Sequence, residues 1–348
     1  MSLKVIYSGL QRENYQPHRG LSFEYNNFYL TLKNMPGLQV IEHPFDRILE
    51  VGKRKFNEEL LALVEKEKPD LFFAFMYTNE LDPNFLLKIK HKTKSVAWFA
   101  DDYWRFWNYS KTWPPYFSWV ITTYSKAIAW YRKQGFENVI PSQWACNDSL
   151  YQPLDLKKDI DISFIGQFKT PRGKIIQTLE AAGLKVQTFG YGWPSGRISQ
   201  EKMLEIFSRS KINLNLNVRP SRLSPKVIAR LFFKKSIDKL KLDFHLLNNL
   251  QAYLHFAIPH THARPFELAG CRAFVISGLS DDIKQSYAEG EEMIFYTSLR
   301  DLIEKIRYYL SHDKEREAIA QSAYQRTLQD HTYKIRFKTL FKKIGISP

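Results

Sequence analysis

Apolar segments of strand length alternate with segments of helical character along this chain, and the alternation runs through it twice. The apolar segments begin, in the first half, at residues 3, 38, 71, 95 and 119 and, in the second half, at 160, 184, 211, 273 and 293. Strands that are apolar throughout and are separated by helices of about 10–15 residues are typical of parallel sheets covered on both faces. The sequence therefore predicts an α/β protein with two Rossmann-like, doubly wound parallel-sheet domains that face a cleft.

The domain boundaries follow from chain length and from the place where the alternation lapses. The chain has 348 residues, and a single core stops growing at roughly 250–300 residues. We expect an N-terminal domain at residues 1–145, a linker at 146–158, and a C-terminal domain at 159–330 that carries a basic insertion at 219–256. A basic helix at 331–348 can return to the first domain.

Composition limits the compartment. No run of about 18 apolar residues occurs, and the opening segment is only briefly apolar, so we expect neither a membrane span nor a signal peptide. The two cysteines, Cys146 and Cys271, are too few for a disulfide framework or for a zinc site made of thiolates. These features favour a cytoplasmic protein.

The formal net charge of +15 is concentrated in two segments. Residues 219–241 hold eight basic residues against one acid, and residues 331–348 hold five basic residues and no acid. In the first segment, cations at every fourth position predict an amphipathic basic helix. These cations are Arg222, Lys226, Arg230 and Lys234. Such a helix can lie on an anionic membrane surface, which would make the protein peripheral on the inner face of the membrane, or it can be a solvated face packed over the cleft.

The loops that follow the strands are the candidate binding regions, because ligands of open parallel sheets bind beyond the carboxyl ends of the strands. Glycines and cations occur in the loops SGLQRENYQPHRG, DDYWRFWNYSKTW, GQFKTPRGK and GYGWPSGR. Between a strand and a helix such residues can form an anion site, since the helix start presents free N–H groups. Neither the phosphate-loop signature nor G-x-G-x-x-G occurs in them, so solvated basic loops are the alternative.

Five segments together resemble one known family: DDYWRF, WACNDSLYQP, FIGQFKTPRGK, GYGW and above all ARPFELAGCRAFVISG with the helical region after it. They are similar to the CgeB-like bacterial glycosyltransferases, which are related to the large nucleotide-sugar-dependent family with the GT-B fold. The resemblance is most specific from Ala263 to Tyr333 and weak from Arg219 to Phe256. It implies transfer of a sugar from a nucleoside diphosphate donor with retention of configuration, and it implies neither a cofactor nor a metal ion.

The resemblance assigns a nucleotide-binding role to the segment RPFELAG. In the wider group a glutamate at the start of this helix binds the ribose hydroxyls, and Glu267 occupies that position, with Pro265 beginning the helix and Phe266 anchoring it. Many relatives have a second glutamate, eight positions earlier, that contacts the donor sugar. Here that position is Pro259, followed by His260. The alternative for Glu267 is a first-turn acid that interacts favourably with the helix dipole.

The resemblance also implies cations for the diphosphate of the donor. Arg172 matches a lysine of the wider group, whereas Gln167 stands where an arginine would follow the glycine. Arg172 would stabilise the charge that develops on the departing diphosphate, which makes it a candidate catalytic residue. The missing charge can come from Lys169, Lys174 or Arg264. The expected donor-binding residues are Gly166, Arg172, Lys174, Gly192, His260, Arg264, Phe266 and Glu267.

Two adjacent carboxylates, Asp101 and Asp102, follow a buried strand of the first domain, which is the acceptor side of the resemblance. They can act as a base or orient the acceptor, or they can cap a turn. Adjacent acids do not form the D-x-D pattern, and His260 and His262 have no acid or cysteine at ligand spacing, so we predict no metal site. Tryptophans in or just after the same loop can stack on an acceptor sugar or fill the core: Trp104, Trp107, Trp113 and Trp119.

These observations predict a glycosyltransferase that uses a nucleotide-sugar donor. Its acceptor would be a glycan, a lipid-linked molecule or a protein, and under one interpretation of the basic helix it would also meet an anionic membrane surface. The alternative is a non-catalytic nucleotide- or glycan-binding protein that kept the GT-B fold, which the residues at Pro259 and Gln167 favour. Nucleic-acid binding is not expected, because no nucleic-acid-binding module is recognisable.

Overall fold

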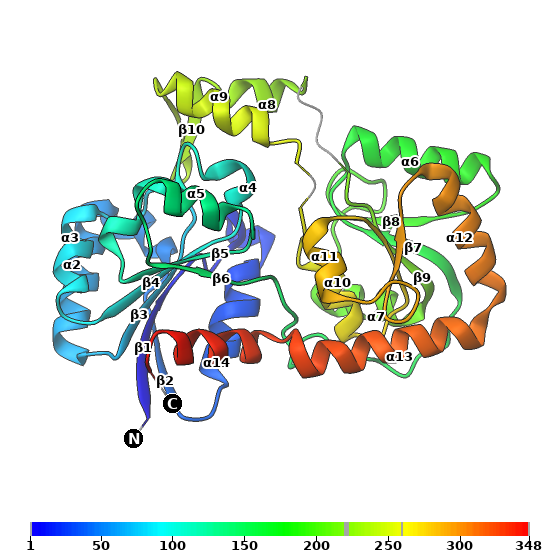
Figure 1. Ribbon diagram of the computed structural model, residues 1–348, viewed down its shortest axis with the longest axis horizontal. Helices are drawn as coiled ribbons and strands as arrows, with labels where there is room; N and C mark the ends of the chain where they lie inside the picture. The colour runs from blue at the N-terminus through cyan, green and yellow to red at the C-terminus, as the bar shows by residue number, and fades with distance from the viewer. Residues whose placement is uncertain (1, 219–222, 259, 347–348) are drawn as a thin grey trace. The chain divides into compact units, whose positions relative to one another are not determined.

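The computed structural model describes residues 2–218, 223–258 and 260–346, and it divides into two compact units. Each unit is built on one parallel sheet with helices packed around it (Figure 1). The two parallel-sheet α/β domains predicted from the sequence are therefore confirmed. The first unit comprises Met1–Gln143, Arg222–Phe256 and Tyr333–Pro348, and the second comprises Trp144–Ser221 and Ala257–Thr332. The segment from 222 to 256, which we expected within the C-terminal domain, packs with the first unit instead.

The sheet of the first unit has six parallel strands in the order β2-β1-β3-β4-β5-β6. Their bounds are Leu3–Ser8 (β1), Leu38–Glu42 (β2), Leu71–Phe75 (β3), Lys94–Phe99 (β4), Trp119–Thr122 (β5) and Val139–Pro141 (β6). All five side chains of β3 are buried, which explains why this strand is apolar throughout. The first five strands coincide with predicted apolar segments. β6, with three residues, is too short to show such a pattern.

Helices cover this sheet, and one of them comes from the end of the chain. They include α1 (Leu30–Lys33), α2 (Ile48–Glu67), α3 (Pro83–Lys90), α4 (Asp102–Arg105), α5 (Ala127–Lys133) and α14 (Tyr333–Lys343). α14 packs against α1, and the rings of Tyr333 and Phe337 lie 4.7 and 5.6 Å from that of Phe28. Lys94 Nζ donates to the carbonyl of Ile344 at 2.9 Å. The C-terminal helix thus completes the core of the first unit.

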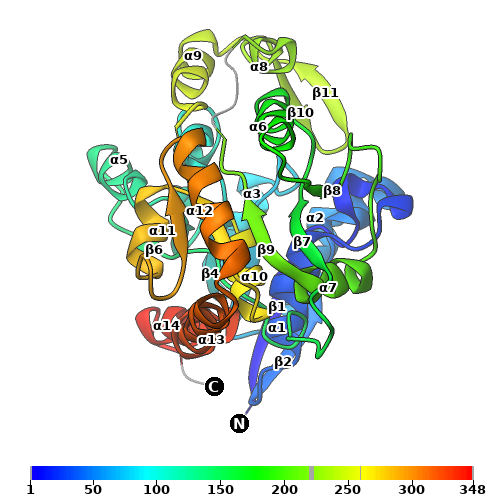
Figure 2. The ribbon, with the colours of Figure 1, turned by 90° about the vertical axis from the view of Figure 1, so that its right-hand side faces the viewer.

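The sheet of the second unit has five parallel strands in the order β13-β12-β9-β7-β8. The strands are β7 (Ile160–Ile165), β8 (Gln187–Phe189), β9 (Ser210–Asn215), β12 (Val275–Gly278) and β13 (Ile294–Tyr296). The helices are α6 (Thr170–Ala181), α7 (Gln200–Arg209), α10 (Arg264–Gly270), α11 (Asp281–Ser286), α12 (Leu299–Ser311) and α13 (Asp313–Asp330). α12 packs on β9, and α10 packs on α13 (Figure 2). Every strand of this sheet overlaps a predicted apolar segment, and β9 begins one residue before its segment.

The basic segment of the first unit is not the long helix that we predicted. It consists of the short helix α8 (Pro225–Ala229), an antiparallel hairpin of β10 (Phe233–Ser236) and β11 (Lys239–Leu242), and the helix α9 (Leu246–His255). Lys234 lies on β10, and Arg222 lies outside the described residues, so the fourfold spacing of cations was misleading. Lysine and leucine alternate along β11, which is the period of a strand.

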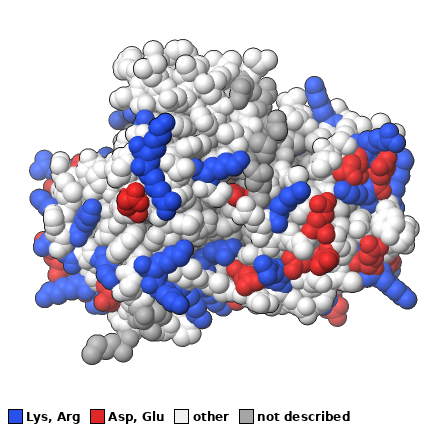
Figure 3. Space-filling model, viewed as in Figure 1, with Lys and Arg blue, Asp and Glu red and all other residues white. Residues whose placement is uncertain are grey.

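The same segment exposes an unusual amount of apolar surface. Among the described residues, eleven of the twenty exposed large apolar side chains belong to it: Leu223, Ile228, Phe232, Phe233, Leu240, Leu242, Phe244, Leu246, Leu247, Leu250 and Leu254. Phe244 is 83% exposed and Leu247 is 81% exposed. Figure 3 shows the surface over α8 and α9 as mostly uncharged, with Lys and Arg along its lower border. None of the described helices combines the length and the apolar character that a membrane span needs.

Candidate functional site

Several predicted donor residues of the second unit lie at one edge of its sheet. The loop after β7 and the loop after β9 meet there, because Arg172 Nε donates to the carbonyl of Leu216 at 3.1 Å. The chain before α10 joins them, since Asn217 Nδ2 donates to the carbonyl of His260 at 2.9 Å. This is the carboxyl edge of the parallel strands, where the fold class places its ligands. Pro259, the departure from the expected glutamate, lies outside the described residues.

A group of cations at this edge surrounds His262. Burial is the main reason why the pKa of His262 lies well below its usual value, and four positive or titratable neighbours lower it further. These neighbours are His260, Arg172, Lys169 and Arg264. The structure thus brings together three of the predicted donor-binding residues. Lys174, by contrast, is exposed on α6, and the structure shows no side-chain contact that joins it to this group.

Arg172 is half-buried, and its guanidinium bonds only to neutral groups. Besides Leu216, Nη1 donates to the carbonyl of Gln167 at 2.9 Å, and the guanidinium lies 5.3 Å from the ring centroid of Phe164. Within the described part of the chain, no carboxylate forms an ion pair with it. Burial lowers the pKa of Arg172 to about 10, so it stays protonated at neutral pH. A partly buried cation without a counter-charge is suited to an anionic ligand.

Glu267 is buried, at 3% exposure, and its carboxylate is held by two side chains. Tyr151 donates its hydroxyl to Oε1 at 2.9 Å, and Arg264 Nη1 lies 2.8 Å from Oε2. Each carboxylate oxygen retains a second acceptor position. Phe266 next to it is fully buried, and its ring packs 5.5 Å from that of Tyr287.

The glycines of the second unit shape its loops through close backbone contacts. Gly190 has a φ of +124°, and a Cβ there would lie 2.4 Å from the carbonyl oxygen of Gly166. Gly192 has a φ of +87°, and a Cβ there would lie 2.8 Å from Cβ of Phe168. Trp193 Nε1 donates to the same carbonyl of Gly166 at 2.8 Å. Gly166 and Gly192 therefore hold the two loops against each other.

In the first unit, the adjacent carboxylates separate. Asp102 is fully buried at the start of α4, and Tyr131 donates its hydroxyl to Oδ2 at 3.0 Å. Burial raises the pKa of Asp102 to about 6. Asp101 is half-buried and borders a cavity of about 720 Å³. Of the pair, Asp101 is therefore the residue that a ligand in this cavity can contact.

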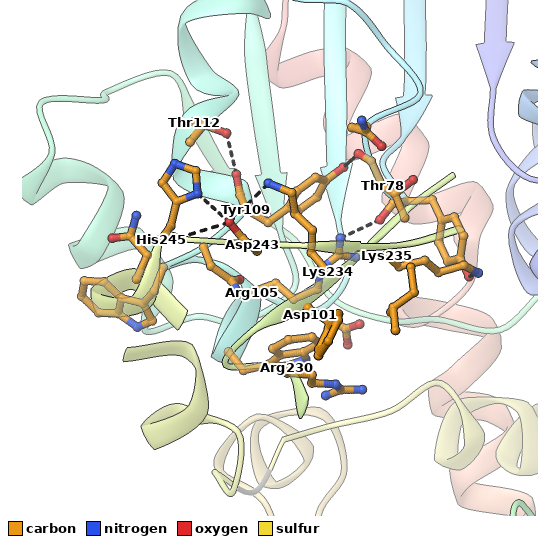
Figure 4. Close-up of a pocket in the computed structure, with 18 of the residues that line it drawn as sticks. Thr78, Asp101, Arg105, Tyr109, Thr112, Arg230, Lys234, Lys235, Asp243 and His245 are labelled. Atoms are coloured by element: carbon orange, nitrogen blue, oxygen red, sulfur yellow. Dashed lines mark hydrogen bonds and ion pairs between the residues drawn. The ribbon is translucent and has the colours of Figure 1, made fainter. Parts of the chain in front are cut away.

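This cavity lies beyond the carboxyl ends of β3 and β4, between their loops and the segment that begins with α8 (Figure 4). Trp104, Trp107 and Trp113 line it, whereas Trp119 lies on β5. The lining also includes charged or titratable residues that the sequence did not single out as site residues: Arg105, Lys235, Asp243 and His245. The alternation of lysine and leucine in β11 could have revealed the hairpin, but not where it packs. Among the described residues, no group of three or more His, Cys, Asp or Glu side chains could hold a metal ion.

With this geometry established, the fold defines a class: two parallel-sheet α/β units with the GT-B architecture of glycosyltransferases. A family model described as glycosyl transferase-like matches residues 244–342. None of the curated proteins matches the chain in sequence.

Solved structures of this class cover nearly the whole chain at low identity. Sucrose-phosphate synthase from Thermosynechococcus elongatus is 10% identical over 98% of this chain and 99% of its own, with a TM-score of 0.62. HepE of Anabaena, solved in complex with UDP and glucose, is 9% identical over 99% of both chains, with a TM-score of 0.58. A glycosyltransferase from Rickettsia africae is 8% identical over 98% of this chain and 97% of its own, with a TM-score of 0.57. At these identities the likeness establishes the fold.

Proposed function

We propose that this protein is a glycosyltransferase that moves a sugar from a nucleoside diphosphate donor to an acceptor. The GT-B fold and the glycosyl transferase-like match over residues 244–342 support it, as does the UDP bound by the structurally similar HepE. The observation that carries the proposal is Arg172. Its half-buried guanidinium lies at the carboxyl edge of the second sheet, where its partners among the described residues are two carbonyls and a ring.

The proposed roles follow from these contacts. Arg172 binds the diphosphate and stabilises the negative charge that it gains as the glycosidic bond breaks. Glu267 accepts hydrogen bonds from the ribose hydroxyls with its remaining acceptor positions. Arg264, which pairs with Glu267, holds that carboxylate in place. We further propose that transfer retains the anomeric configuration and needs no metal ion, which leaves the departing diphosphate to be stabilised by cations of the chain.

A panel of nucleoside diphosphates tests the proposal. We expect one of UDP, GDP, TDP and ADP to raise the melting temperature of the full-length protein, because a ligand at 100 times its dissociation constant stabilises by about 2.7 kcal/mol. The corresponding nucleotide sugar should then be consumed when a suitable acceptor is present. If none of the four changes the melting temperature at millimolar concentration, the proposal is wrong.

The second candidate function is a non-catalytic binding protein with the same fold. The observation that favours it is Gln167, which stands where the wider group has an arginine for the diphosphate. The two candidates differ in turnover. A protein that binds a nucleotide sugar but neither transfers nor hydrolyses the sugar during prolonged incubation, as followed by mass spectrometry, would be the binding protein.

We also propose that the protein works at the cytoplasmic face of an anionic membrane, which it meets through the segment 223–256. The exposed apolar side chains described above support this proposal, in place of the basic helix that the sequence predicted. This segment carries six basic and two acidic residues. A dimer formed through two copies of the segment would therefore bring like charges together. Apolar side chains interspersed with lysines match a surface that offers both hydrocarbon and negative charge.

Replacing two of these side chains should detach the protein from vesicles. We expect the wild-type protein to sediment with phosphatidylglycerol vesicles and the variant Phe244→Glu/Leu247→Glu to bind them roughly tenfold more weakly or worse, because each buried Phe or Leu contributes about 1.5–3 kcal/mol. Both side chains are more than four-fifths exposed, so folding should be unaffected. The matched control is Leu49→Glu/Leu87→Glu, two exposed positions elsewhere in the first unit. Equal loss in the control, or a change from dimer to monomer in the variant, would contradict the proposal.

A further inference from the structure

The cavity of the first unit is positively charged. Seven charged side chains border it, five basic and two acidic: Arg105, Lys226, Arg230, Lys234, Lys235, Asp101 and Asp243. One of the acids is already neutralised within the protein. Asp243 Oδ1 lies 2.6 Å from His245 Nδ1 and 3.5 Å from Lys234 Nζ, and although burial opposes its ionisation, these contacts keep the pKa of Asp243 below its usual value. Four cations and one carboxylate, Asp101, are left to meet a ligand.

Two of these cations donate hydrogen bonds to neutral groups. Arg105 Nη2 donates to the carbonyl of Tyr77 at 2.6 Å. Lys235 Nζ donates to the hydroxyl of Tyr77 at 2.6 Å and to Asn14 Oδ1 at 3.0 Å. Figure 4 shows Lys235 and Arg105 at the same cavity. Burial lowers the pKa of Lys235, while the charges of Glu80 and Asp238 raise it by smaller amounts.

Arg230 is held by aromatic rings. Its guanidinium lies 4.5 Å from the ring centroid of Trp104 and 4.4 Å from that of Phe256. Burial lowers its pKa, while the charge of Asp101 raises it by a smaller amount. In the part of the chain that the structure describes, no carboxylate forms an ion pair with Arg105, Arg230 or Lys235. An anion in the cavity would therefore provide the ion-pair partner that all three lack.

The cavity also has the features of a sugar site. Its volume of about 720 Å³ suits a ligand the size of one or two sugar rings. Trp104, Trp107 and Tyr109 line it, and aromatic faces pack against the apolar faces of sugar rings.

We propose that this cavity is the acceptor site and that the acceptor is a sugar that carries a phosphate group, an inference that rests on the glycosyl transfer proposed above. A phosphate monoester carries about −1.5 to −2 charges at neutral pH. As a monoester or as a diester, its oxygens can accept charge-assisted hydrogen bonds from several cations of the lining at once. The segment 223–256 supplies Arg230 and Lys235, so it selects the acceptor, while Asp101 is placed to orient the acceptor hydroxyl.

Calorimetric titration of the full-length protein tests the site, with glucose 1-phosphate, its octyl phosphodiester and methyl glucoside as probes and with UDP either absent or saturating. We expect both phosphate esters to bind at least roughly tenfold more tightly than methyl glucoside, because each charge-assisted hydrogen bond contributes about 1.5–3 kcal/mol. Tighter binding of the octyl diester than of glucose 1-phosphate would identify a lipid-linked acceptor, and the reverse order would identify a free sugar phosphate.

Variants of the lining residues test whether the phosphate esters bind in the cavity. Arg230→Gln/Lys235→Gln should weaken ester binding roughly tenfold or more. Arg230→Lys, which keeps the charge, should retain most of it. The matched control is Lys239→Gln/Lys241→Gln, which removes two exposed cations from the same hairpin that do not border the cavity. The melting temperature of each variant without ligand reports whether it is folded.

Three results would overturn the proposal: equal affinity for methyl glucoside and the esters, equal loss in the control and in Arg230→Gln/Lys235→Gln, or competition between UDP and the esters for one site. The outcome also separates this proposal from the one on which it rests. Ester binding that depends on Arg230 and Lys235 in a protein that binds no nucleoside diphosphate would reject sugar transfer and leave the phosphate site standing. Nucleotide binding without such ester binding would reject the phosphate site and leave the proposed sugar transfer standing.

Discussion

Arg172→Ala should weaken binding of the preferred nucleoside diphosphate by roughly 10- to 100-fold, because a charge-assisted hydrogen bond to phosphate contributes about 1.5–3 kcal/mol. The corresponding nucleoside, which lacks phosphate, should bind the variant as well as it binds the wild-type protein. The measurement is calorimetric titration of both ligands into both proteins. The contrast between ligands matters because the guanidinium also bridges the carbonyls of Gln167 and Leu216, so its loss can disturb the loops themselves.

Two controls separate the phosphate contact from such a disturbance. Lys185→Ala removes the same charge from an exposed position of the second unit and should leave affinity for the diphosphate unchanged within about threefold. The melting temperature of Arg172→Ala without ligand measures what the loops lose. If the variant loses affinity for the nucleoside and for the diphosphate equally, Arg172 does not bind phosphate.

Glu267→Gln is expected to have two effects, one on binding and one on stability. Loss of the carboxylate should weaken the nucleoside diphosphate roughly tenfold or more, because the ribose hydroxyls lose an ionised acceptor. It should also lower the free energy of unfolding by about 1–3 kcal/mol, because Arg264 loses its ion-pair partner in a buried environment. Calorimetry and thermal unfolding measure the two effects independently.

Tyr151→Phe is the matched control for this pair of effects. It deletes the hydroxyl that donates to Glu267 at 2.9 Å but keeps the carboxylate. We expect it to lower stability while leaving nucleotide affinity within about threefold of wild type. A 2′-deoxyribose analogue should shrink the binding penalty of Glu267→Gln, since one of the two proposed bonds is then already absent. If Glu267→Gln is less stable but binds the nucleotide normally, the glutamate serves only to hold Arg264 and the start of α10.

The fold could be predicted from the sequence because parallel strands buried on both faces leave a strong signal. β3 and β12 are apolar or small along their whole length, and no local alternative explains such segments. The hairpin of β10 and β11 was predicted wrongly because two different periods follow one another in this segment. Cations recur at every fourth position, while lysine and leucine alternate from Lys239 to Leu242. Contacts from outside decide between them, among them the bond from the Ile237 amide to Thr78 Oγ1 at 2.8 Å.

The candidate site was predictable only where a short motif carries the chemistry. Arg172 and Glu267 were selected from the segments around them, and the roles proposed for them stay predictions. Their partners could not be selected in this way. Tyr151 lies 116 positions from Glu267 in the chain, and no local pattern links the two. Asp101 and Asp102 look equivalent in the sequence, but the start of α4 turns one toward the cavity and the other toward Tyr131.

The position of α14 in the first unit has a consequence for how the chain folds during synthesis. The helix fills the core beside Phe28 with residues that follow the entire second unit in the sequence. When residues 1–143 leave the ribosome, the apolar surface that later receives Tyr333, Phe337 and Phe341 has nothing to cover it. The second unit can fold as soon as residue 332 has emerged, whereas the core of the first unit is complete only after α14 has emerged. The nascent chain therefore carries an incomplete first unit through most of translation, and that unit is the one that offers binding surface to chaperones.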